Sequence, residues 1–75
     1  MDYQLYMNIA ISASGSLTNG ATFALKDLFS VEDWTRLSKG ERGNFGKYFK
    51  NQVLEGLVPG VSFLEKKSSL IYRKR

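Results

Sequence analysis

The chain has 75 residues, a formal net charge of +4 at pH 7, and neither cysteine nor histidine. A chain of this length forms one small domain, which buries only about 60% of the surface that its unfolded form exposes. The lack of cysteine excludes disulfide bonds, and without cysteine or histidine we expect no zinc site and no other metal or cofactor.

No targeting or membrane signal is evident. No apolar run approaches the roughly 20 residues that a membrane-spanning helix needs. The first residue after Met1 is Asp2 rather than a base, which argues against a secretory signal. We therefore expect a cytoplasmic protein that does not act at a membrane.

The charges are unevenly distributed along the chain. Residues 1–33 hold one base and four acids, whereas residues 34–75 hold ten bases and three acids. A basic half suggests an anionic partner for one face of the domain. A solubilising surface charge explains the same imbalance equally well.

The N-terminal segment, residues 3–12, alternates between two sets of side chains. One set is Tyr3, Leu5, Met7, Ile9 and Ile11, and the other is Gln4, Tyr6, Asn8, Ala10 and Ser12. This period of two, with β-branched and aromatic residues, predicts a strand with one buried face. Residues 12–21 are small and polar and include the turn pair Asn19-Gly20, so we expect a loop there. The alternative is a flexible linker that lets the strand pair with a neighbouring copy, which would give a homodimer.

The middle of the chain predicts a short strand and two brief helical segments. Phe23 is typical of a strand that enters a helical turn over residues 25–29. Ser30 and Asp33 then have the spacing of a capping box, which begins a helix that carries Trp34 and Leu37.

A second capping box begins the longest helix. Ser38 and Glu41 have the required spacing, and the helix is expected to continue to about Glu55. Gly56 is suited to end it, and Pro59 cannot continue it. Its apolar arc, which we expect to face the core, carries Phe45, Phe49 and Val53. Residues 61–75 then predict a β-hairpin with its turn near residues 66–69.

The predicted order is therefore strand, three short helices and a C-terminal hairpin. We interpret residues 1–75 as one α+β domain, with an N-terminal strand and flexible loop at 1–21 and a winged-helix-like core at 22–75. In such a domain the third helix lies in the major groove of DNA and the hairpin lies beside it on the backbone. A generic α+β arrangement is the alternative.

The candidate nucleic-acid-binding residues lie on the outer arc of the long helix and on the hairpin, except Arg42, which lies near the core arc in the first turn and is expected to project along the helix start toward a DNA backbone. Lysine and asparagine reach phosphates and base edges, and each neutralised phosphate releases counterions. The alternative is that these side chains form a solvated surface and that the basic C-terminus is a disordered tail. The candidates are Arg42, Asn44, Lys47, Lys50, Asn51, Lys66, Lys67 and Arg73.

Three glycines, Gly40, Gly43 and Gly46, recur at every third position of the same helix. Each costs up to about 1 kcal/mol relative to alanine in a helix interior. One interpretation is that they allow another helix or a sugar-phosphate strand to approach this helix closely. The alternative is that they lie in a frayed first turn.

We expect no catalysis. Histidine and cysteine are absent, and the serines of the two capping boxes have structural roles. The sequence has no phosphate-binding loop and no dinucleotide-binding glycine pattern.

The central motif resembles that of a family of short bacterial and phage proteins of unknown function. The resemblance covers residues 22–72 and rests on the pattern F-x-LKDLF, a tryptophan, an arginine and G-x-x-F-x-x-x-V. It implies a shared fold and a phage or mobile-element context, and it implies no activity. The matching residues here are Phe23, 25–29, Trp34, Arg42, Gly46, Phe49, Val53 and Tyr72.

Two functions follow from these observations. The first is a small DNA-binding protein without catalysis that acts as a phage or mobile-element regulator. The second is a protein-interaction module, for instance a phage-encoded inhibitor that docks on a host nucleic-acid enzyme through its basic face or its first strand.

Overall fold

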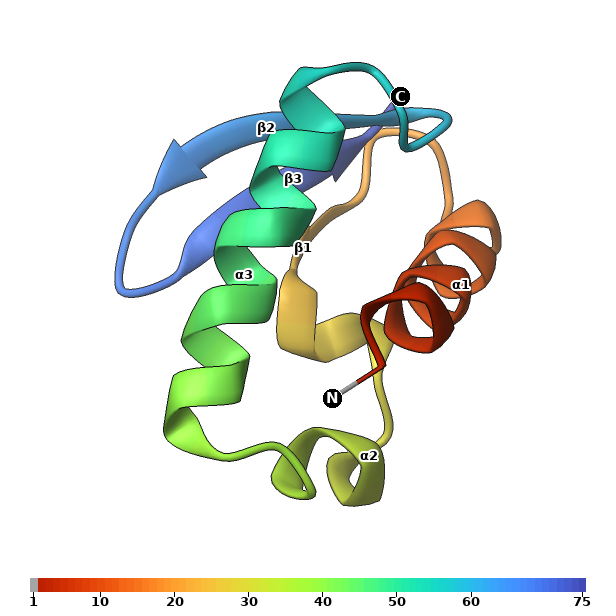
Figure 1. Cartoon of the computed structure of the whole chain (residues 1–75). Coiled ribbons are helices and arrows are strands. Elements are labelled where there is room, and N and C mark those ends of the chain that lie inside the picture. Colours follow the sequence, from red (N-terminus) through yellow and green to blue (C-terminus); the bar gives the residue numbers. More distant parts are fainter. Residues whose placement is uncertain (1) are drawn as a thin grey trace.

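A computed structural model of the protein describes residues 2–75. Its three α-helices and three-stranded antiparallel sheet confirm the α+β class (Figure 1). The order of elements is α1 (Tyr3–Gly15), β1 (Thr22–Ala24), the 3-10 helix η1 (Leu25–Leu28), α2 (Val31–Thr35), α3 (Lys39–Leu54), β2 (Val61–Lys66) and β3 (Leu70–Lys74).

The N-terminal segment is a helix, so the predicted strand at residues 3–12 is wrong. Asp2 caps this helix, since its carboxylate accepts a hydrogen bond of 3.1 Å from the Leu5 backbone N–H. The buried residues Met7, Ala10 and Ser14 follow helical spacing. The alternating pattern was misleading because it placed Ala10, which is fully buried, on the solvent side.

The loop after α1 is tied to the sheet. The Gly20 N–H donates to the Lys74 carbonyl at 2.6 Å, and the Lys74 N–H donates to the Ala21 carbonyl at 2.8 Å. Gly20 has a φ of +89°, which explains the predicted Asn19-Gly20 turn. Since residues 3–12 are helical, they offer no strand for exchange with a second copy, and dimerisation by that route has no basis.

The predicted short strand, the helical turn and the start of α2 are confirmed, but α2 ends at Thr35, so Leu37 lies in the connection to α3 and not in the helix as expected. Phe23 lies in β1, and η1 follows it directly. The Asp27 carboxylate accepts a hydrogen bond of 2.9 Å from the Ala24 N–H and so fixes the start of η1. At the start of α2, the Ser30 hydroxyl accepts a hydrogen bond of 3.1 Å from the Asp33 N–H. The reciprocal bond of the predicted capping box, from the Ser30 N–H to the Asp33 carboxylate, is not formed among the described residues.

The long helix α3 also has the predicted limits. At its start the Glu41 N–H donates to the Ser38 hydroxyl at 3.1 Å, and the Ser38 N–H donates to the Glu41 carboxylate at 2.9 Å. Its core residues are Phe45, Phe49 and Val53, as expected. After the helix, Gly56 has a φ of +76°, a conformation that favours glycine.

The sheet has the strand order β1-β3-β2, so its third strand is β1 rather than an N-terminal strand. Tyr72 in the central strand pairs with Phe23 on one side and Phe63 on the other. These three rings lie on the inner face of the sheet, because paired residues of adjacent strands share a face. A β-bulge interrupts the β2–β3 pairing between Phe63 and Glu65.

The core lies between this inner face and the helices. Helix α3 crosses the sheet, and α1 packs beside η1 and α3 (Figure 1). The fully buried Phe49 meets the Tyr72 ring edge-on, with centroids 5.0 Å apart. Phe45 contacts Tyr3 and Tyr6 of α1, each at 5.9 Å between ring centroids. Aromatic packing therefore holds α1, α3 and the sheet together.

Candidate nucleic-acid interface

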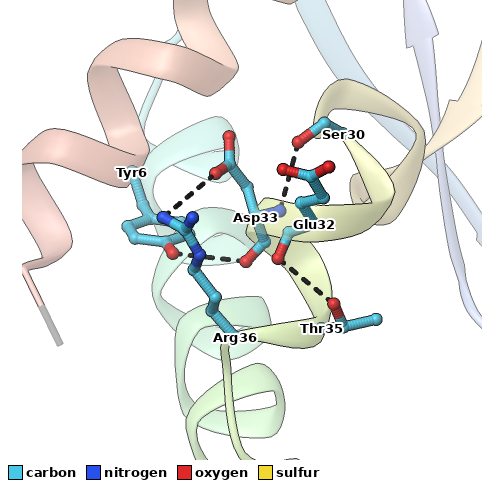
Figure 2. A network of polar contacts seen from close by, with 6 residues as sticks. All are labelled: Tyr6, Ser30, Glu32, Asp33, Thr35 and Arg36. Carbon is cyan, nitrogen blue, oxygen red and sulfur yellow. Dashed lines mark hydrogen bonds and ion pairs between the residues drawn. The ribbon is translucent and has the colours of Figure 1, made fainter.

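Side chains from both neighbouring helices hold α2 in place. Figure 2 shows the Tyr6 hydroxyl of α1 donating to the Asp33 carbonyl at 3.3 Å. From α3, the Arg42 Nε–H donates to the Trp34 carbonyl at 3.2 Å. The Trp34 carbonyl also accepts a hydrogen bond of 3.2 Å from the Leu37 N–H, so Arg42 adds a second donor to it. The two side chains thus tie the C-terminal half of this five-residue helix to α1 and α3.

The outer face of α3, which we define as Asn44, Lys47 and Asn51, points away from the core. All three residues are exposed. None of their side chains forms a hydrogen bond or ion pair with the part of the chain that the structure describes. The structure thus brings three of the predicted residues together with their polar groups free to contact a partner.

Gly40 and Gly43 border this face and meet no packing constraint. A Cβ atom at Gly43 would have nothing within 4 Å, and one at Gly40 would meet only the Ser38 hydroxyl at 4.0 Å. Neither glycine has a positive φ. Packing within the chain therefore does not explain them, and the capped start of α3 argues against fraying.

Lys50 lies on the side of α3 that faces the hairpin. Its Nζ lies 4.7 Å from the centroid of the Phe63 ring on β2. This cation–π contact joins α3 to the hairpin and keeps the charge partly exposed. Lys50 is therefore at the junction between the outer face of α3 and the hairpin.

The hairpin turn carries the next two predicted residues. Lys66 and Lys67 are both exposed. Lys66 pairs with Leu70 and therefore shares the inner face of the sheet, on the side of α3. The Nζ of Lys67 lies 3.8 Å from the Glu65 carboxylate, an exposed pair that neutralises part of the charge at the turn.

The structure separates Arg42 and Arg73 from the other predicted residues. Arg42 is half-buried and is bound to the Trp34 carbonyl. Arg73 pairs with Thr22 and Ser62 and follows the inward-facing Tyr72, so it lies on the outer face of the sheet. These two arginines are not part of one continuous surface with Lys47.

One exposed base was missed by the sequence analysis. Lys39 is the first residue of α3 and is exposed. It lies 11 positions before Lys50, so both fall on nearly the same side of a helix with 3.6 residues per turn. The helical period alone could have identified it.

One titratable group of this region, the Glu41 carboxyl, has a pKa that differs clearly from its ordinary value. The hydrogen bond from the Ser38 N–H lowers the pKa of the Glu41 carboxyl below its ordinary value of 4.5. Glu41 is therefore ionised at neutral pH. Within residues 2–75, no helix is long and apolar enough to cross a membrane.

Comparisons with known proteins identify the family. No curated protein and no solved structure matches the chain. A family model described as a domain of unknown function (DUF1413) matches residues 8–75, from within α1 to the end of the chain. The chain therefore belongs to this family of unknown function, DUF1413.

Proposed function

We propose that the protein is a small, non-enzymatic DNA-binding protein of the cytoplasm with a winged-helix-like arrangement. Helix α3 would enter the major groove, and the β2–β3 turn would lie on the adjacent backbone. A regulatory role in a phage or mobile element is the context that the family resemblance suggests.

The order of elements supports this proposal. Helices α2 and α3 are joined by residues 36–38, which is the length of the turn in helix-turn-helix motifs. The hairpin follows α3, and β1 completes the sheet beside β3. Helix α3 has 16 residues and a length of about 24 Å, enough to span a major groove.

The observation that carries the proposal is the outer face of α3. Asn44, Lys47 and Asn51 are exposed and have no side-chain partner in the described chain. Asparagine pairs with adenine through two hydrogen bonds, and lysine contacts phosphate or guanine. Because Gly40 and Gly43 leave the start of this face without side chains, a DNA backbone could approach the helix closely.

The hairpin supplies the second half of the interface. Lys66 and Lys67 extend the positive charge beyond α3, where the turn projects past the helix (Figure 1). Lys50 lies between the two parts, with its charge above the Phe63 ring. Contact with phosphates at both parts would give a binding constant that depends steeply on salt.

The test is fluorescence anisotropy with a labelled random-sequence duplex at several salt concentrations. We expect micromolar binding that weakens with salt. Lys47→Ala should weaken it and lower the slope of log K against log salt by about one unit if Lys47 contacts a phosphate. Arg73→Ala is the matched control, because it removes one exposed charge from the outer face of the sheet.

Two results would contradict the proposal. One is the absence of binding at low salt, and the other is an equal effect of Lys47→Ala and Arg73→Ala. In the first case the second candidate, an inhibitor that occupies the DNA channel of a host enzyme with the same basic face, would be favoured. Capture of a nucleic-acid enzyme by the wild type but not by Lys47→Ala would then identify it.

A further inference from the structure

A pocket of about 150 Å³ lies where β1, η1, α2, α3 and β3 meet. Leu25, Trp34, Leu70 and Tyr72 line it, as do Arg42 and Gly46 of α3. The pocket is largely apolar and open to solvent. A cavity of this volume lined by apolar side chains is large enough to hold a benzene ring.

Gly46 keeps this space open. It has no positive φ, so the backbone does not require glycine. A Cβ atom at this position would have nothing within 4 Å, so close packing does not require it either. Glycine is unfavourable inside a helix, and its one evident consequence here is that no side chain projects from α3 beside the pocket.

The charged groups of the pocket are all positive. Arg42 and Lys26 line it, and no carboxylate does. The Arg42 Nε–H is bound to the Trp34 carbonyl, which leaves the four other N–H donors of the guanidinium without a partner in the described chain. Among residues 2–75 Lys26 forms no ion pair, and the neighbouring Asp27 carboxylate accepts a hydrogen bond from the Ala24 N–H.

We propose that this pocket binds a small organic carboxylate with a compact apolar body. The body would lie against Trp34 and Leu70, and the carboxylate would contact Arg42 and Lys26 at the rim. Arginine is suited to this role because its planar guanidinium binds carboxylates through parallel hydrogen bonds. This site is distinct from the outer face of α3, and its occupation does not depend on DNA binding.

The test is a titration of the isotope-labelled protein with sodium benzoate, followed by two-dimensional NMR in the absence of DNA. Benzamide, which has the same ring and no charge, is the comparison ligand. We expect saturable shifts at the Trp34 indole and at the Gly46 and Leu70 amides, and weaker binding of benzamide. Lys26→Gln should weaken benzoate binding up to about fivefold, the range for one exposed ion pair.

Gly46→Leu should abolish binding because its side chain would fill the pocket. Gly43→Leu is the matched control, since a Cβ atom there also meets nothing within 4 Å and Gly43 does not line the pocket. Circular dichroism of both variants would establish that the helix is retained. Equal binding of benzoate and benzamide would overturn the proposal, as would unchanged binding in Gly46→Leu or the absence of saturable shifts.

Discussion

The Arg42 guanidinium joins helix α3 to helix α2 through a hydrogen bond of 3.2 Å from its Nε to the Trp34 carbonyl. Helix α2 has only five residues, too few to be stable without tertiary contacts. The orientation of α2 relative to α3 therefore depends on this bond and on the bond from Tyr6 to Asp33.

Replacement of Arg42 by alanine should lower the free energy of unfolding by about 1.5–3 kcal/mol, the range for a hydrogen bond to a charged group. Urea unfolding would measure the change. Arg36→Ala is the control, because Arg36 forms only an exposed pair with Asp33 at 4.0 Å and should change stability by no more than about 1 kcal/mol. Equal losses of unfolding free energy in the two variants would show that the Arg42 hydrogen bond stabilises the fold no more than the exposed ion pair does.

Tyr72 is completely buried, and its hydroxyl has no hydrogen-bond partner in the described chain. An unsatisfied buried hydroxyl costs about 1–3 kcal/mol. Tyr72→Phe should therefore be at least as stable as the wild type at neutral pH. A clear loss of stability on thermal unfolding would contradict the absence of a partner.

The same hydroxyl should make stability depend on pH. Burial raises the pKa of Tyr72 from 10.0 to about 12, so the folded protein holds this proton more tightly than the unfolded chain. The contribution is complete below pH 10 and is lost as the pH rises toward 12, by at most about 1.4 kcal/mol per pH unit. Lysines also titrate in this range, so the prediction concerns the difference in unfolding free energy between the wild type and Tyr72→Phe.

The capping box of α3 should contribute to stability at neutral pH and less in acid. Ser38→Ala should cost about 1 kcal/mol, because the Glu41 N–H loses its acceptor. The pKa of Glu41 is lowered by its bond from the Ser38 N–H, so its contribution is present above pH 4.5 and is lost as the pH falls through the folded value. Denaturant unfolding of the wild type and Glu41→Gln between neutral and acid pH would test this, and parallel profiles would refute it.

A methyl group at position 43 should have opposite effects on folding and on the proposed DNA binding. Gly43→Ala should raise the free energy of unfolding by about 0.5–1 kcal/mol, because alanine favours the helix and its methyl group meets no neighbour. Under the DNA-binding proposal, the same methyl group should weaken binding in the anisotropy assay. Gly15→Ala, at the end of α1, should leave binding unchanged, and equal binding by both variants would argue against close approach at Gly43.

The helical nature of the N-terminal segment gives a further prediction. Ala10 is fully buried and Leu5 is 52% exposed. Ala10→Leu should therefore cost about 1–3 kcal/mol through overpacking, and Leu5→Lys should stay within about 0.5 kcal/mol of the wild type. A strand with the alternating pattern would give the opposite order in a thermal unfolding series.

Local signals in the sequence were sufficient for much of the fold. The capping serines Ser30 and Ser38 correctly predicted the starts of α2 and α3, and Gly56 correctly predicted the end of α3. The hairpin turn near residues 66–69 was also correct. These features depend on hydrogen bonds between residues close in sequence, which a short stretch of chain determines by itself.

The choice between strand and helix for the N-terminal segment depends on tertiary packing. Residues 3–12 fit a strand as well as a helix, because Tyr3, Met7 and Ile11 fall on one side under either period. The Asp2 cap is a local signal for the helix, which the sequence analysis missed. The burial of Ala10 favours the helix only once the core is known. The same limit applies to β1, whose three residues become a strand through pairing with β3, about 50 residues away.

The candidate sites show the same division. The sequence alone placed Asn44, Lys47 and Asn51 on one polar arc of α3, because the helical period fixes which side chains share a face. Only the tertiary structure separated Arg73 from that arc, brought Arg42 to the Trp34 carbonyl, and formed a pocket from five elements. Residues distant in sequence meet through the packing of the whole core, and no local pattern encodes that arrangement.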